Sequence, residues 1–435
     1  MDFSWPLGHD RPPAMAGRQL VAGERSGSGA GRSCRTDLAR DCEPQALVVS
    51  SWQVETTPRP PAVRVTREKR LPALDGLRGL AVLSVLIVHA NGLLDPTRPV
   101  EHAMAALSEL GAYGVDLFFV LSGFLITGIL LDSRASPNYF SNFYARRFLR
   151  LFPVYYGYLL VVAMAIPALH RAVRTSMPDY GGGWGWYLAY LSNWKPGRGA
   201  SDPYLGHFWS LAVEEQFYLL WPATIFFVPR RMLAHSFLGI VTLAIALRIG
   251  MAAHGVWWNT LYRITPARTD ALALGALAAL AVRNHRWQAY FSARARTVFL
   301  LSVGAFSVTA IAAGDASWKS PLNQTVGSVF VETAFAALVL KAAAPGFGLI
   351  KRIGTTKWLM AFGKYSYTMY VIHVAVYFHL MWLIAWVTKR FSVRLTLPAE
   401  IACGILMIAT VFFLASLSWR YIESPLLSLK KRFPY

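Results

Sequence analysis

Long apolar runs alternate with short polar segments along most of the chain. Ten such runs recur from residue 71 onward, at residues 74–94, 112–132, 151–170, 208–228, 237–254, 266–282, 297–314, 324–344, 366–388 and 397–417. About 20 apolar residues in a helix cross the hydrocarbon core of a bilayer. The pattern therefore predicts an all-α polytopic membrane protein with about ten transmembrane helices. The aromatic segment 184–194 is too short to cross, so we expect it to be re-entrant or interfacial.

Composition supports a membrane protein over a soluble one. The 435 residues are 55% hydrophobic, 14% aromatic and only 15% charged, with a mean hydropathy of +0.38. Soluble domains carry about 25% charged residues, so a soluble enzyme, a disordered protein and a coiled coil are all disfavoured. A net charge of +20 would suggest nucleic acid in a soluble chain. Here the basic residues lie between apolar runs, which indicates a lipid bilayer as the partner and no nucleic acid.

The distribution of Lys and Arg predicts the topology and the domain boundaries. Ten spans with both termini in the cytoplasm put more than twice as many basic residues inside as outside. Residues 1–70 lack an apolar run and are expected to form a disordered basic cytoplasmic tail. A membrane domain is expected over 71–428, followed by a short cytoplasmic C-terminus at 429–435. Three cysteines with no CxxC pattern indicate neither a disulfide framework nor a metal site.

The first apolar run contains three polar residues of functional interest. Arg78 and His89 are eleven positions apart, so they share one helix face and are separated by about 16 Å along the axis. Asp75 lies three positions before Arg78 and can hold its guanidinium. A charge at the bilayer centre costs about 2.5–3.5 kcal/mol, which makes such residues functional candidates. The alternative is a snorkelling arginine and a histidine buried in the helix packing.

Two further groups lie in the second and third runs. Asp116 lies just inside the outer boundary of the second run. Arg146, Arg147 and Arg150 lie at the inner end of the third run, and the planar guanidinium suits phosphate groups. Anchoring by the positive-inside rule explains the same arginines equally well.

The fourth run opens with a polar helix face. His207, Ser210, Glu214 and Tyr218 follow helical spacing and predict an acid/base or sugar-binding cluster at the outer boundary. Trp209 belongs to the same stretch.

The sixth and ninth runs contain four more candidate residues. Arg268 and Asp270 lie at an outer boundary, where a surface ion pair is an equally good interpretation. Tyr370 and His373 share a face of the ninth run and place a second histidine at membrane depth.

An ordered set of motifs resembles one known family. After Arg78 and His89 come GVDLFFVLSGFLI, RRFLRLFP, HFWSLAVEEQFYLLWP, the Arg268/Asp270 element, YSYTMYVIH and RYIESP. Over residues 71–428 the chain resembles the acyltransferase-3 family of integral membrane O-acyltransferases. The resemblance implies a ten-helix core that moves an acyl group, commonly acetyl, from cytoplasmic acyl-CoA to a hydroxyl group. The acceptors implied include lipopolysaccharide, exopolysaccharide, peptidoglycan and glycosylated natural products. The extra hydrolase-like domain of some members is not expected, because the sequence ends at residue 435.

The resemblance also implies roles for individual residues. The arginine and histidine of the family's first helix correspond to Arg78 and His89, and its Trp-Ser-Leu-x-x-Glu signature corresponds to Trp209, Ser210, Leu211 and Glu214. The catalytic residues expected are His89, as general base or transient acyl carrier, with Glu214 and Asp75. Acyl-CoA, with acetyl-CoA foremost, is expected to contact Arg78, Arg146, Arg147 and Arg150. The carbohydrate acceptor is expected to contact His207, Trp209, Ser210, Tyr218, Asp116, Arg268, Asp270, Tyr370 and His373. No metal is implied, and the location implied is the bacterial inner membrane.

A secondary transporter is the competing interpretation, because ten spans with intramembrane charges also describe carriers. Internal symmetry separates the two classes. Arg78 and His89 have no clear counterpart in a second half, although His373 leaves a diverged repeat open. The sequence leaves the oligomeric state open.

Overall fold

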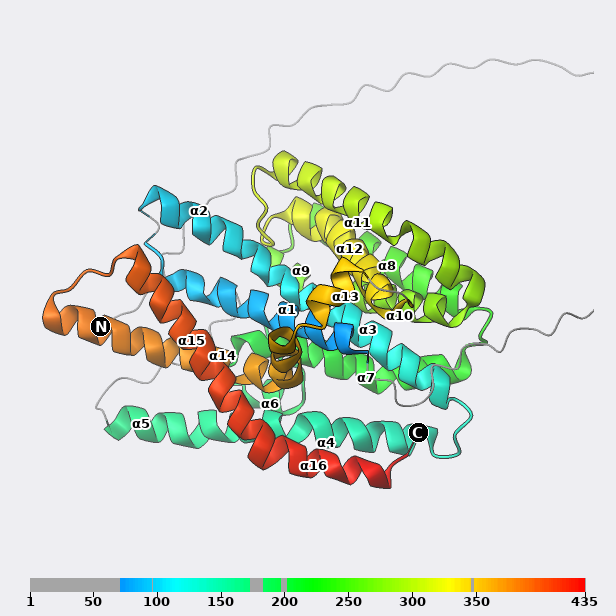
Figure 1. Cartoon of the computed structure of the whole chain (residues 1–435), viewed down its shortest axis with the longest axis horizontal. Helices are drawn as coiled ribbons and strands as arrows, with labels where there is room; N and C mark the ends of the chain where they lie inside the picture. Colours follow the sequence, from blue (N-terminus) through cyan, green and yellow to red (C-terminus); the bar gives the residue numbers. More distant parts are fainter. Residues whose placement is uncertain (1–70, 96, 173–182, 197–201, 346–347, 435) are drawn as a thin grey trace, which may run out of the picture. The chain divides into compact units, whose positions relative to one another are not determined.

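The chain is helical throughout the part that the computed structural model describes. That part comprises residues 71–95, 97–172, 183–196, 202–345 and 348–434, and it contains no strand. The predicted tail, residues 1–70, lies outside it. The helices are α1 Pro72–Ala90, α2 Pro99–Ser108, α3 Gly114–Ser133, α4 Tyr139–Leu160, α5 Ile166–Ala172, α6 Trp184–Leu188, α7 Trp209–Phe227, α8 Leu233–Ala253, α9 Trp258–Arg263, α10 Thr269–Arg283, α11 His285–Ala313, α12 Ser328–Ala343, α13 Leu349–Gly354, α14 Lys357–Phe391, α15 Leu397–Ser418 and α16 Ser424–Ser428 (Figure 1).

Among the residues that the structure describes, eight helical segments are long and apolar enough to cross a membrane. They are Pro72–Leu93, Pro99–Ser133, Tyr139–Ala172, Leu233–Ala253, His285–Ala313, Asn323–Ala343, Lys357–Phe391 and Leu397–Arg432. The expectation of an all-α polytopic membrane protein is confirmed. The other two predicted spans correspond to α7, which contains two adjacent glutamates, and to α10, which has only 15 residues. That these two helices also cross the membrane stays a prediction.

Helix α1 packs closely against α14 because glycines line the contact. A Cβ atom built on Gly79 would collide with the carbonyl oxygen of Leu359, and one built on Gly363 would collide with that of Asp75. Small residues let the backbones of membrane helices approach each other. This approach brings the face of α1 that carries His89 against the face of α14 that carries His373.

A second close pair consists of α3 and α10. Here a Cβ atom on Gly123 would collide with the carbonyl oxygen of Leu272, and one on Gly275 with that of Val120. The Arg268–Asp116 pair joins the N-terminal ends of the two helices, and the Arg283–Asp132 pair joins their C-terminal ends. The two helices therefore run parallel, and α10 packs in addition against α8 and α12.

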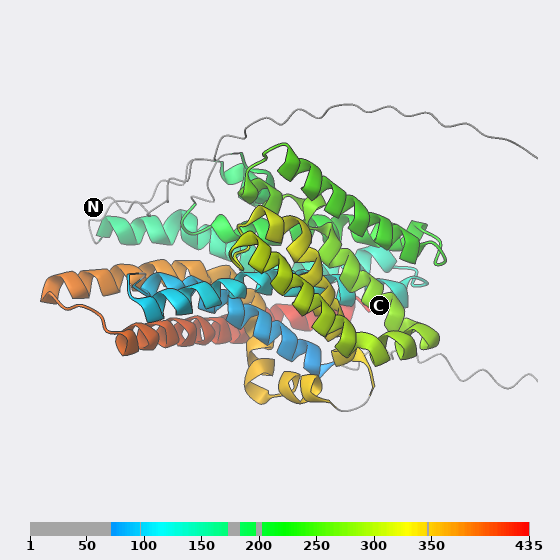
Figure 2. The ribbon, with the colours of Figure 1, turned by 90° about the horizontal axis from the view of Figure 1, so that it is seen from above.

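The C-terminal helices cover α14 and α4. Helices α14 and α15 run side by side in both views (Figures 1 and 2). Helix α16 packs against α4, where Arg146 Nη1 donates hydrogen bonds to the carbonyl oxygens of Lys430 and Phe433 at 3.2 and 2.8 Å. On the α14 side of α4, Tyr367 Oη donates to the carbonyl oxygen of Leu151 at 2.9 Å.

The aromatic segment at residues 184–194 is short, as predicted. It forms α6 and a 3-10 turn, Ser192–Trp194. Gln216 of α7 fixes it, because its amide donates to the Tyr190 carbonyl at 2.8 Å and to Asn193 Oδ1 at 2.9 Å. Tyr187 of α6 donates to Asp202, and burial together with this hydrogen bond raises the pKa of Tyr187 well above its usual range. A re-entrant or interfacial position for the segment stays a prediction.

Candidate active site

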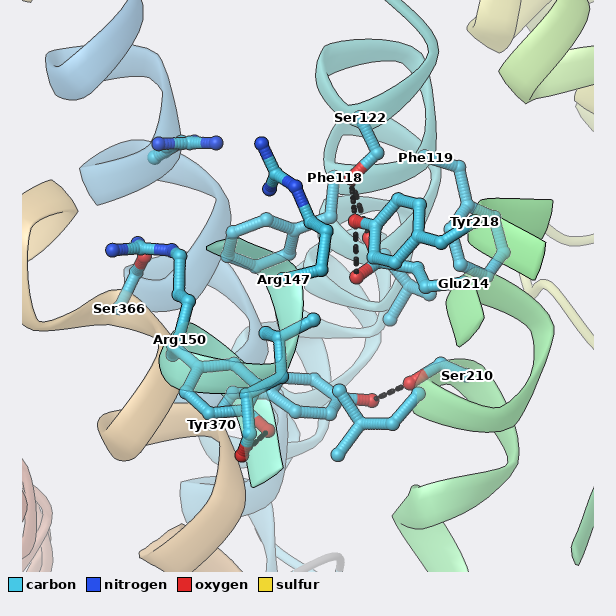
Figure 3. A pocket seen from close by; sticks show the side chains of 15 residues that line it. Phe118, Phe119, Ser122, Arg147, Arg150, Ser210, Glu214, Tyr218, Ser366 and Tyr370 are labelled. Carbon is cyan, nitrogen blue, oxygen red and sulfur yellow. Dashed lines mark hydrogen bonds between the residues drawn. The ribbon is translucent and has the colours of Figure 1, made fainter. Parts of the chain in front are cut away.

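Five helices line a pocket with about 640 Å³ of empty space, part of which is open to solvent (Figure 3). The helices are α1, α3, α4, α7 and α14, which are far apart in the sequence. The lining residues are Arg78, Val115, Phe118, Phe119, Ser122, Arg147, Arg150, Leu151, Ser210, Leu211, Glu214, Tyr218, Ser366, Tyr367 and Tyr370. Seven of the predicted site residues therefore meet in one cavity: Arg78, Arg147, Arg150, Ser210, Glu214, Tyr218 and Tyr370.

Three guanidinium groups give the pocket its positive charge. Arg78 comes from α1, and Arg147 and Arg150 come from successive turns of α4. Arg78 Nη1 lies 4.0 Å from Asp75 Oδ1, and both side chains are partly exposed. Arg147 lies 5.7 Å from the ring centre of Tyr218, within the range of a cation–π contact. Arg146 does not line the pocket, since it is turned toward the C-terminal residues.

A single carboxylate faces this positive charge. Glu214 Oε1 accepts a hydrogen bond from Ser122 Oγ at 2.7 Å, and its Oε2 accepts one from Tyr218 Oη at 3.1 Å (Figure 3). Ser122 and Tyr218 are in turn 3.1 Å apart. Because Glu214 and Tyr218 are four residues apart on α7, the predicted shared face is confirmed for them. The two hydroxyl donors hold the carboxylate in a fixed orientation inside the pocket.

A second pair of hydroxyls lies elsewhere in the same pocket. Ser210 Oγ and Tyr370 Oη are 2.6 Å apart, and each lies 3.2 Å from the carbonyl oxygen of His207. Because each hydroxyl has one proton, one of them donates to the other, and the second donates to that carbonyl. Their hydrogen bond joins α7 to α14 (Figure 3).

Three histidines pack together next to this hydroxyl pair but do not line the pocket. The ring of His373 lies 4.6 Å from that of His89 and 4.8 Å from that of His207, edge-on in both cases. His373 is fully buried, His207 is buried and His89 is half-buried. His207 was expected on the helix face of Ser210 and Glu214. It lies instead in the 3-10 turn Gly206–Phe208 before α7, with Nε2 bonded to the Val371 carbonyl at 3.0 Å.

The predicted Arg268 and Asp270 take part in a buried ionic network and not in a surface ion pair. Arg268 pairs with Asp116, and Asp270 pairs with Arg248 of α8. Glu332 of α12 lies 3.8 Å from Arg248 Nη1 and 3.9 Å from Arg268 Nη1. All five side chains are at most 2% exposed. The surface interpretation fails because α3, α8 and α12 all pack against α10, and the five side chains are buried among these helices.

Arg248 and Glu332 were not among the predicted site residues. Each is a charged residue inside an apolar run, so the rule that intramembrane charges mark functional or structural centres would have identified both. Trp209, which was expected to contact the acceptor, packs against the rings of Phe119 and Tyr262 and does not line the pocket. Across the described ranges, no group of three or more His, Cys, Asp or Glu side chains has a geometry that can hold a metal ion.

Comparison with known proteins identifies the family. The model of the acyltransferase 3 family, described as an acyltransferase domain, matches residues 71–417. The chain is 28% identical over 386 residues to peptidoglycan O-acetyltransferase OatA of Listeria monocytogenes, covering 83% of this chain and 57% of that protein. It is also 28% identical over 375 residues to O-acetyltransferase OatA of Staphylococcus aureus, covering 82% and 57%. The chain thus spans a little over half the length of these relatives.

No solved structure matches the chain significantly. The match to the family model covers most of the described residues and every helix that lines the pocket. The chain therefore belongs to the acyltransferase 3 family.

Proposed function

We propose that this enzyme transfers an acyl group, acetyl foremost, from acyl-CoA to a hydroxyl group of a cell-envelope carbohydrate. The observation that carries the proposal is the charge of the pocket, where Arg78, Arg147 and Arg150 face the single carboxylate of Glu214. Three cations and one anion in a semi-enclosed cavity favour a polyanionic donor. The phosphates of CoA supply that charge, and the guanidinium fork matches their oxygens.

The rest of the pocket suits the uncharged part of such a donor. Apolar side chains, among them Phe118, Phe119 and Leu211, form much of the lining and fit a pantetheine chain. The hydroxyl pair Ser210–Tyr370 can donate a hydrogen bond to the carbonyl oxygen of a thioester. Glu214 was expected to meet the acceptor from the outer side. Its position among the arginines supports instead a role in orienting the donor.

His89 is the base that this arrangement favours. Its Nδ1 lies 2.8 Å from the carbonyl oxygen of Val85, which can only accept, so Nδ1 bears the proton and Nε2 keeps its lone pair. A half-buried neutral imidazole can remove the proton of an acceptor hydroxyl as the ester forms. We propose that the donor enters from the cytoplasmic side near α4 and that the acceptor approaches His89 from the opposite side. Both termini are then cytoplasmic, in the bacterial inner membrane.

The proposed class of acceptor is inferred from the names of the two OatA relatives. One is named a peptidoglycan O-acetyltransferase and the other an O-acetyltransferase, which supports cell-wall glycan as the first acceptor to test. Mass spectrometry of envelope glycans with and without the gene should show one added acyl group per modified sugar. Identical glycan and glycoside masses in both strains would contradict the proposal.

The donor is tested with the purified protein in lipid nanodiscs and labelled acetyl-CoA. Arg150→Gln removes a charge that lines the pocket, and a hydrogen bond to a charged group contributes about 1.5–3 kcal/mol. We therefore expect the KM for acetyl-CoA to rise by about 10–100-fold. Arg146→Gln on the same helix is the matched control, because Arg146 contacts C-terminal carbonyls outside the pocket. Equal KM values for the two variants would contradict the assignment of the pocket to the donor.

A further inference from the structure

The C-terminal segment, defined as residues 429–434, lies against α4. Two side chains of α4 hold its backbone. Arg146 donates a hydrogen bond to the carbonyl oxygen of Lys430 at 3.2 Å, and the amide of Asn142 donates one to the carbonyl oxygen of Pro434. The segment is therefore fixed next to the helix that supplies two arginines of the donor pocket, although the proposed function gives it no role.

The side chain of Lys430 lies among the arginines. Its ammonium group interacts electrostatically with four guanidinium groups, those of Arg78, Arg146, Arg147 and Arg150. Three of these four, all except Arg146, line the pocket. Lys430 is half-buried, whereas the next residue, also a lysine, is exposed. The C-terminal segment thus adds one more cation to the positive end of the pocket.

This extra cation has no carboxylate partner in contact. Glu423 is near enough to interact with Lys430, but its Oε1 accepts a hydrogen bond from Thr368 Oγ1 at 2.6 Å. Among the described residues, the ammonium group of Lys430 forms neither a hydrogen bond nor an ion pair. Like charges repel, so a lysine in this position is unfavourable unless an anion binds between it and the arginines. The arrangement therefore indicates a phosphate-binding position beyond the pocket arginines.

The length of the pocket suits CoA in this orientation. Ser210 of the hydroxyl pair and Tyr218 are eight residues apart on α7, which is about 12 Å along the helix axis. Arg147 lies 5.7 Å from the ring centre of Tyr218. An extended pantetheine arm can therefore join a thioester at the hydroxyl pair to a diphosphate at the arginines. The adenosine end, which bears the 3′-phosphate, then lies beyond the arginines and next to the C-terminal segment.

We propose that Lys430 binds the 3′-phosphate of the CoA donor and makes the enzyme prefer CoA to 3′-dephospho-CoA. This inference rests on the proposed function. A lipid headgroup offers the same phosphate chemistry to a cation at the membrane surface. The 3′-phosphate is favoured because the guanidinium groups around Lys430 line the donor pocket.

The test compares two ligands that differ only in the 3′-phosphate. Binding of CoA and of 3′-dephospho-CoA to the full-length protein is measured by isothermal titration calorimetry, in nanodiscs of zwitterionic lipid and in nanodiscs of anionic lipid. Lys430→Gln removes the charge, and Lys430→Arg keeps it. The matched control is Lys431→Gln, because Lys431 is the adjacent lysine and its side chain is exposed.

The ratio of the two Kd values is the informative quantity. A hydrogen bond to a charged group accounts for about 10–100-fold in affinity, so the wild type should bind CoA tighter than 3′-dephospho-CoA by that factor. In Lys430→Gln the ratio should fall close to 1, because only the affinity for CoA decreases. Lys430→Arg and Lys431→Gln should keep most of the wild-type ratio. A variant that merely disturbs packing would weaken both ligands equally and leave the ratio unchanged.

Three results would overturn the role of Lys430 alone. They are equal affinity of the wild type for the two ligands, an unchanged ratio in Lys430→Gln, and a wild-type preference that disappears in anionic nanodiscs, which would assign Lys430 to a lipid phosphate. If the wild type binds neither ligand, the proposed CoA donor is wrong and the role of Lys430 is excluded with it.

Discussion

Removing one arginine from the buried ionic network should destabilise the protein far more than removing an exposed one. The network contains three acidic side chains, those of Asp116, Asp270 and Glu332, and two guanidinium groups, those of Arg248 and Arg268. Arg268→Gln removes the guanidinium partner of Asp116 in a region that is at most 2% exposed. Breaking a buried ion pair by removing one partner costs about 3–5 kcal/mol. We expect a loss of that size in the free energy of unfolding.

The same two helices provide a matched control. Arg283 of α10 pairs with Asp132 of α3 at 2.6–2.8 Å, but these side chains are 21% and 41% exposed. Exposed pairs contribute about 0–1 kcal/mol, so Arg283→Gln should be nearly neutral. The assay is thermal unfolding of the purified variants in one detergent, with Tm as the readout.

A double variant tests the electrostatic cause directly. Adding Asp116→Asn to Arg268→Gln removes the carboxylate that the single variant leaves without its guanidinium partner. The double variant should therefore be more stable than Arg268→Gln alone, although it differs from the wild type at two sites. If the Tm of Arg268→Gln equals that of Arg283→Gln within error, burial does not make the Arg268 ion pair more important for stability. A double variant with a lower Tm than Arg268→Gln would likewise contradict the electrostatic cause.

Three further outcomes follow from the helix packing, the base and the topology. Gly363→Ala should cost about 1–3 kcal/mol of stability, because its Cβ meets the Asp75 carbonyl, whereas Gly157→Ala, with open space around it, should leave Tm unchanged. His89→Asn keeps the donor to the Val85 carbonyl but loses the base, so transfer should fall by at least about 10²-fold with normal membrane insertion; near-normal turnover would exclude His89 as base. An alkaline phosphatase fused after residue 435 should be inactive, because a cytoplasmic C-terminus keeps the reporter inside; high phosphatase activity would reject the proposed topology.

The apolar runs were sufficient to predict the fold class, because hydrophobicity and length decide whether a helix suits a bilayer. Helical periodicity also placed Glu214 and Tyr218 on one face, as found. Both inferences depend on residues close together in the sequence, where the geometry of a single helix fixes the answer.

Partners on different helices could not be predicted in this way. Arg268 was considered with Asp270, two residues away, yet it pairs with Asp116, which is 152 positions distant. Helical spacing gives the direction in which a side chain points but not the helix it meets. The glycine contacts decide that, since Gly123 and Gly275 set the contact that brings α3 against α10. Glu214 and Arg147 lie on different helices, so helical spacing could not predict that they line the same pocket.

The site has two parts that share helices. The charged pocket is lined by α1, α3, α4, α7 and α14, and the three packed histidines, His89, His207 and His373, come from α1, the turn before α7 and α14. Tyr370 and Ser210 belong to both parts, since they line the pocket and also lie 3.2 Å from the carbonyl oxygen of His207. In the proposed reaction, the acyl group passes this hydroxyl pair on its way from the donor at the arginines to the acceptor next to His89. Changes to the arginines should affect donor saturation and changes to the histidines should affect turnover, while Tyr370 and Ser210 are the residues at which both quantities should change together.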